Sequence, residues 1–111
     1  MSTRPRAVPP RPGAQRTSIP SHLERQERKL WTELTAAHDF TDAASGALLQ
    51  ATLEAHQRAR RCRELVDRDG EAMEDRFGQL KPHPLLAAER DARAAFLSGM
   101  RALALDLAGS A

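Results

Sequence analysis

The chain has 111 residues, of which 4% are aromatic, and a formal net charge of +2. This length gives room for one domain and little more, and a core that is poor in aromatic rings is only marginally stable against chain entropy. The single cysteine excludes an internal disulfide, and no apolar run approaches the roughly 18 residues of a membrane span. The composition favours an intracellular protein, and the Arg- and Pro-rich N-terminus lacks the apolar segment of a signal peptide.

The first 18 residues are predicted to form a disordered basic arm. Residues 1–20 contain four arginines and no acid, which leaves 13 basic and 15 acidic side chains for the rest of the chain. Four prolines and a glycine forbid a helix there. A basic arm on a near-neutral body is typical of proteins that contact phosphate backbones, although an inert solvated tail is the alternative. The candidate DNA contacts in the arm are Arg4, Arg6, Arg11 and Arg16.

A first helix is predicted over residues 22–37. Ser21 and Glu24 have the spacing of a capping box, in which the serine hydroxyl and the glutamate carboxylate each accept a bond from a backbone amide of the first turn. The apolar residues fall on one face between charged neighbours, which is the pattern of a surface helix with one buried side. These residues are Leu23, Leu30, Trp31 and Leu34.

The longest helix is predicted over residues 42–69, with Thr41 as its N-cap and Gly70 ending it in a left-handed conformation. It would span about 42 Å at a rise of 1.5 Å per residue, which is longer than a domain of this size requires. Small residues along one stripe permit close helix approach, either within the subunit or between copies. The candidate oligomer-interface residues are Leu48, Ala51, Ala55, Ala59 and Cys62, together with Phe96 and Met100 from the last helix.

Residues 71–82 are predicted to form an extended segment or a small hairpin, because Met73, Phe77 and Leu80 are spaced among charges around Gly78. Pro84 suits the first position of a third helix over residues 84–105. Gly99 indicates close packing inside that helix, since a helical glycine costs about 1 kcal/mol relative to alanine. The helical core domain is placed at residues 19–108 and a frayed end at 109–111.

No constellation of residues indicates catalysis or a cofactor. The four histidines are far apart in the sequence and the one cysteine has no ligand partner, so a metal site is not expected. Cys62 is interpreted as a small buried residue, and no glycine-rich phosphate loop is present. The carboxylates between residues 67 and 75 are interpreted as solvated charge near a helix end or, alternatively, as the edge of a partner surface.

A second group of arginines lies in the long helix. These residues point around much of the helix at 100° per residue, so they do not make one stripe, and some are expected to pair with Glu54, Glu64 or Asp67. They are nevertheless candidate phosphate contacts. The group consists of Arg58, Arg60, Arg61 and Arg63.

The order of these motifs resembles the small terminase subunits of tailed double-stranded DNA bacteriophages. Pro20-x-His22-Leu23 is followed by Leu30-Trp31-x-x-Leu34, a Thr41-Asp42 helix start and a long Ala/Glu/Arg helix. The Lys81-Pro82-His83-Pro84-Leu85 lead-in and the Glu89-Arg90-Asp91-Ala92 helix complete it, so that the resemblance covers residues 18–108. The chain departs from similar proteins at Ala104, where they often have glycine, and it ends soon afterwards, which puts their C-terminal partner segment in doubt.

The resemblance implies a mainly α protein of three helices that assembles into a ring-like homo-oligomer. It also implies a non-catalytic role in genome packaging: binding viral DNA near the packaging start and loading or regulating the large terminase, which holds the ATPase and nuclease. The expected location is the cytoplasm of the infected or lysogenic host. The alternative function is that of a helical adaptor or regulator that acts through protein contacts without binding DNA.

Overall fold

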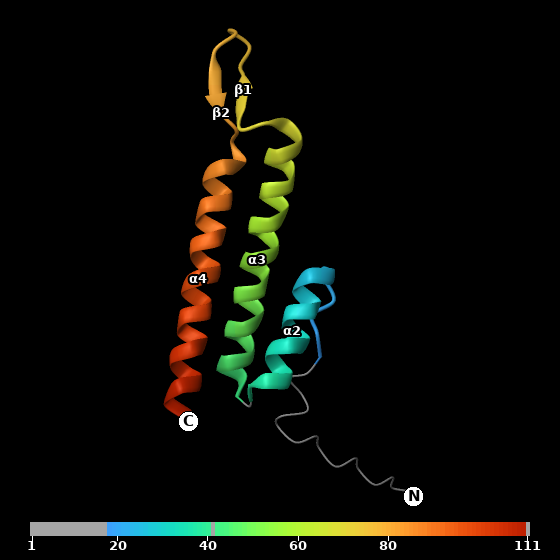
Figure 1. Ribbon diagram of the computed structural model, residues 1–111, viewed down its shortest axis with the longest axis vertical. Coiled ribbons are helices and arrows are strands. Elements are labelled where there is room, and N and C mark those ends of the chain that lie inside the picture. Colours follow the sequence, from blue (N-terminus) through green and yellow to red (C-terminus); the bar gives the residue numbers. More distant parts are fainter. Residues whose placement is uncertain (1–17, 41, 111) are drawn as a thin grey trace, which may run out of the picture.

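The computed structural model of the chain describes residues 18–40 and 42–110. Its elements are α2 (Arg25–Ala37), α3 (Ala43–Asp69), β1 (Ala72–Glu74), β2 (Leu80–Pro82) and α4 (Leu85–Ser110). The long helices α3 and α4 run antiparallel side by side, and α2 packs along the N-terminal half of α3 (Figure 1). The mainly helical class, the three helices and the hairpin before the last helix are therefore confirmed, while the predicted arm lies almost entirely outside the described residues.

The hydrophobic core lies at the end of the molecule where the three helices meet. Trp31 of α2, Leu49 and Leu53 of α3 and Leu103 of α4 are all at most 4% exposed. Leu23 and Phe40, which flank α2, complete this cluster. Beyond α2, the end of α3 that lies nearest the hairpin has only α4 beside it, so this end of the molecule is two helices thick (Figure 1).

The start of α2 differs from the sequence prediction. Pro20 and Leu23 close a turn, with the Leu23 amide donating to the Pro20 carbonyl at 3.2 Å, and the helix begins at Arg25. Glu24 is the N-cap residue and makes no side-chain capping bond. The predicted capping box is wrong because the Glu24 amide donates instead to Oε1 of Gln57 on α3, at 2.7 Å. A contact distant in sequence replaces the local one.

The start of α3 is capped by Asp42, whose Oδ1 accepts from the Ser45 amide at 2.6 Å. The predicted cap, Thr41, lies outside the described residues. At the other end Gly70 has the predicted positive φ of 92°, but its ψ of 151° is extended rather than left-handed helical. Its amide still donates to the Val66 carbonyl. Helix α4 continues to Ser110, past the expected end at 105 and into the segment expected to fray.

Replacing Asp42 by Ala is expected to lower the free energy of unfolding by about 1 kcal/mol, because the Ser45 amide loses its acceptor. Asp42→Asn keeps an acceptor oxygen and should stay within a few tenths of a kcal/mol of the parent. Urea titration followed by circular dichroism measures both. Equal losses in the two variants would show that the carboxylate charge, and not the capping bond, stabilises this helix start.

Helix α4 packs closely against α3 at Gly99, where the sequence predicted close packing. A Cβ atom on Gly99 would lie 2.1 Å from Oγ1 and 2.9 Å from Cβ of Thr52, so no larger residue fits without movement. The Thr52 hydroxyl itself donates to the Leu48 carbonyl at 2.7 Å. This contact fixes how closely the two long helices approach.

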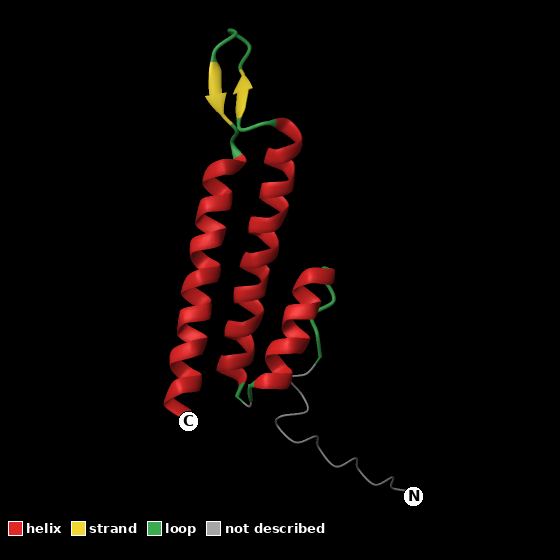
Figure 2. Ribbon diagram, in the orientation of Figure 1, coloured by secondary structure: helices red, strands yellow, loops and turns green. Residues whose placement is uncertain are grey.

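The hairpin projects from the end of the α3–α4 pair, away from the core (Figure 2). Ala72 pairs with Pro82, Met73 with Lys81 and Glu74 with Leu80. At its base His83 is 5% exposed, bonds Asp69 through Nε2 at 2.9 Å and accepts the Leu85 amide through Nδ1 at 3.0 Å. His83 therefore caps α4 and joins the hairpin to the end of α3, with Pro84 directly before the helix.

Candidate functional site

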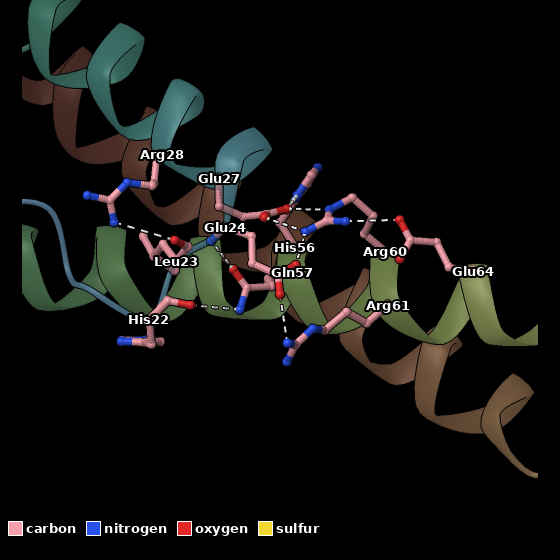
Figure 3. A network of polar contacts seen from close by, with 10 residues as sticks. All are labelled: His22, Leu23, Glu24, Glu27, Arg28, His56, Gln57, Arg60, Arg61 and Glu64. Carbon is pink, nitrogen blue, oxygen red and sulfur yellow. Dashed lines mark hydrogen bonds and ion pairs between the residues drawn. The ribbon is translucent and has the colours of Figure 1, made fainter.

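A network of charged side chains joins α2 to the middle of α3 (Figure 3). Glu27 of α2 is fully buried, and its carboxylate accepts two bonds from the Arg60 guanidinium, at 3.0 and 2.9 Å. Nδ1 of His56 lies 2.6 Å from the same carboxylate. The charge of Glu27 is thus matched by groups on the neighbouring helix.

The pairing keeps Glu27 and Arg60 ionised. Burial raises the pKa of the Glu27 carboxyl, but the hydrogen bonds from Arg60 and His56 outweigh this effect and leave the pKa below its ordinary value. The hydrogen bond to Glu27 is the main cause that raises the pKa of Arg60. Because a buried unpaired charge is costly, this network is sensitive to the loss of any one partner.

The same network fixes the segment that precedes α2. Arg60 and Arg61 both pair with Glu24, the latter at 2.7 Å. The Gln57 side chain accepts from the Glu24 amide and donates to the His22 carbonyl at 3.1 Å. Residues 22–24, which directly precede α2, are therefore held against the middle of α3.

The candidate arginines do not have equal surroundings. The four arm residues lie outside the described part of the chain. Arg60 is only 18% exposed and is bound by three carboxylates of its own subunit, and Arg63 contacts Asp67, Glu71 and Glu89. Arg61 is exposed but paired with Glu24, whereas Arg58 is exposed and makes no ion pair with any residue of the described ranges 18–40 and 42–110.

The candidate interface residues fall into two groups. Ala59 and Cys62 are 5% and 7% exposed, so both are buried within the subunit. The others are partly or fully exposed, and among them Leu48 and Met100 pack against the edge of the core. The Phe96 ring meets the His56 ring edge-on, with 4.9 Å between the two ring centroids. Ala51 and Ala55 line an open groove of about 610 Å³ on α3. Only the partly or fully exposed residues have surface left for contact with another molecule.

Two features of the site were missed by the sequence interpretation. Glu27 has the charge of a surface residue, and nothing within α2 indicates that Arg60, which follows 33 residues later, would bury it. Asp75 was assigned to solvated charge, yet its Oδ1 accepts the Phe77 and Gln79 amides and shapes the hairpin loop. An aspartate at the start of a glycine-containing turn is a recognisable signal for this role, because its side chain can accept a bond from the backbone amide two residues later.

Among the residues that the structure describes, no three histidine, cysteine or carboxylate side chains gather where a metal ion could be held. No helix in this part of the chain is both long and apolar enough to cross a bilayer.

The fold and these surfaces define a small protein built on an antiparallel helical hairpin with a charged anchor for its N-terminal segment. The chain belongs to the phage terminase small-subunit family, whose family model matches residues 26–110. This range runs from the start of α2 to the end of α4 and confirms the family resemblance found in the sequence. No curated protein and no solved structure gives a significant match.

Proposed function

We propose that this chain forms a homo-oligomeric ring that binds viral DNA at the packaging start and recruits or regulates the large terminase subunit. The observation that carries the proposal is the family match over residues 26–110. We further propose that the subunit is not an enzyme and acts in the cytoplasm of the phage's host. The large subunit then supplies the ATPase and the nuclease.

The open faces of the α3–α4 pair support assembly. A pair of helices buries one stripe of each helix, and the opposite stripes remain open unless another element covers them. On α3 and α4 these open positions are small, as at Ala51, Ala55 and Ala95, which allows another helix to approach closely. Copies of the subunit packed side by side would cover these stripes.

Charge and anchoring support DNA binding by the arm. Its four arginines are free of nearby acidic residues in the sequence. The arm is followed by residues 22–24, which Gln57, Arg60 and Arg61 hold against α3. A ring would therefore display one arm from each subunit at the same height. Several weak phosphate contacts on one assembly add through avidity. Arg58 and Arg61, as the exposed arginines of the second group, form the alternative surface.

Deleting residues 1–17 is expected to weaken binding of double-stranded DNA steeply and to leave the assembly intact. Four phosphate contacts per arm contribute about 3.6 to the slope of log K against log salt, so the deletion should flatten that slope. Fluorescence anisotropy with a labelled duplex at several salt concentrations measures affinity and slope together. Replacing the four arginines by lysine keeps the charge and serves as the control, which should retain most of the affinity.

Unchanged DNA affinity in the deletion variant would move the contact to the body of the ring. Absence of any salt-dependent DNA binding by the full chain would favour the alternative function, a helical adaptor that acts only through protein contacts. A pull-down with the large terminase separates that adaptor from a protein with no role in packaging.

A further inference from the structure

Most of the large apolar side chains that are exposed in the described part of the chain lie on the hairpin. Four large apolar side chains are exposed in the described part of the chain, and three of them lie here: Met73 at 39%, Phe77 at 76% and Leu80 at 73%. The hairpin projects beyond the ends of α3 and α4 (Figure 2), where these side chains stay exposed. Exposed apolar residues gathered on one protruding element are typical of a binding surface.

The hairpin is built to hold its shape without that support. Besides accepting two loop amides through its side chain, Asp75 donates its own amide to the Gln79 carbonyl at 2.9 Å. Gly78 takes the positive φ of 80° that the turn requires. A short two-stranded hairpin is marginal on its own in water, so this dense bonding keeps the Phe77 loop in one conformation. The loop is preorganised for contact.

A groove of suitable character lies on the α3–α4 pair. Its apolar lining consists of Ala51, Ala55, Cys62, Leu65 and Leu85, and its polar lining consists of His22, Glu54, Gln57, Arg58 and Arg61. Ala55 and Arg58 also border a second hollow of about 370 Å³ that continues the groove toward Ala88 and Ala95 of α4. The groove is open, and three of its five apolar lining residues are small, so its apolar part has room for a large apolar side chain from outside.

The hairpin face that carries Leu80 and the groove carry opposite charges. Glu74 lies directly opposite Leu80 in the strand register, so the two side chains share one face of the hairpin. Within residues 18–40 and 42–110, neither Glu74 nor Arg58 forms an ion pair, and both are exposed. In the loop, Arg76 is also exposed and unpaired within these ranges, and it lies over the Phe77 ring at 5.2 Å from the centroid. The strand face that carries Leu80 thus has the negative charge of Glu74. Arg58 is the uncompensated charge at the groove, because Glu54 and Arg61 there pair with His22 and Glu24.

We propose that the hairpin of one subunit docks into the α3–α4 groove of the neighbouring copy, with Phe77 and Leu80 on the apolar floor and Glu74 paired with Arg58. This inference rests on the proposed homo-oligomeric ring and names the contact that builds it. Hairpin and groove are different surfaces, so the contact is heterologous, which is the kind that generates rings of more than two subunits. The hairpin projects beyond the end of the α3–α4 pair, whereas the groove runs along the side of this pair as far as Leu85 (Figure 1). The subunits must therefore tilt against the ring axis so that the hairpin of one subunit reaches the groove of its neighbour.

The test is a charge exchange across the contact, followed by mass photometry and light scattering of the full chain. Glu74→Arg alone and Arg58→Glu alone should each shift the oligomer toward smaller species by at least tenfold in apparent dissociation constant, because like charges then face each other. The double variant should recover the assembly. Gln79→Ser on the hairpin and Arg101→Glu on α4 are matched controls that should assemble like the parent.

A second variant tests the apolar part. Phe77→Ser combined with Leu80→Ser keeps Asp75 and Gly78, so the loop should fold, and the oligomer should dissociate. Intact rings in this variant, or single charge variants that assemble normally, would overturn the proposed contact while leaving the ring itself standing. Intact rings that no longer bind the large terminase would show that the hairpin's partner is that subunit and would equally overturn it. A parent chain that is monomeric would instead refute the proposed ring.

Discussion

Replacing Glu27 by Gln is expected to lower the free energy of unfolding by about 3 kcal/mol, at a fixed subunit concentration. The change preserves side-chain volume, so the loss comes from charge. Glu27 is fully buried and pairs with Arg60, which is only 18% exposed and would keep its charge with weaker compensation. Denaturant titration followed by circular dichroism gives the difference, and Trp31 fluorescence reports whether α2 loosens from the core.

The matched control is Glu64→Gln, which removes a partner of the same guanidinium. The Glu64 side chain is 61% exposed, so its loss should cost less than about 0.5 kcal/mol. Because the pKa of Glu27 is lowered in the folded state, its contribution is present above the ordinary pKa of a glutamate and disappears as the pH falls through the folded value. The gap between the parent and Glu27→Gln should therefore narrow below about pH 4. A gap that stays constant with pH would contradict the ionic origin of the effect.

Replacing Gly99 by Ala is expected to destabilise the subunit by about 2 kcal/mol, although alanine is the better helix former. The new Cβ would lie 2.1 Å from the Thr52 hydroxyl oxygen and 2.9 Å from its Cβ, so α3 and α4 must separate. Adding Thr52→Ala removes the hydroxyl and methyl contacts and should restore part of the loss. Thermal and urea unfolding of both variants measure the two effects.

Gly46 offers the same substitution in open space. A Cβ there meets nothing within 4 Å, and the residue lies within α3. Gly46→Ala should raise the free energy of unfolding by about 0.5 kcal/mol through lower chain entropy. Gly99→Ala and Gly46→Ala should thus change stability in opposite directions. If both stabilise the protein, α3 and α4 approach each other less closely than described.

The helices and the hairpin were predictable because local signals define them. Pro82 is the last residue of β2 and Pro84 directly precedes α4, while Gly70 ends α3 and Gly78 permits the turn. The limits of the prediction appear where a distant residue competes with a local one. Ser21 and Glu24 have the capping-box pattern, but the Glu24 amide bonds to Gln57, which the sequence places 33 residues away.

The arginines of α3 show the same limit for the candidate site. Helical periodicity places Arg58, Arg60 and Arg61 around the helix, but it does not say which of them meets an acid of another element. The structure separates Arg60, which is committed to Glu27, from Arg58, which is available to a partner. The ion pair between Arg63 and Asp67 was foreseeable, because residues four apart lie on the same face of a helix about one turn from each other.

The central claim is that the subunit is completed by copies of itself. Mass photometry of the full chain at nanomolar concentration, repeated by light scattering at micromolar concentration, measures the number of subunits directly. We expect one discrete species well above a dimer at both low and high salt, because apolar and small-residue surfaces hold it together. A monodisperse monomer at micromolar concentration would contradict it.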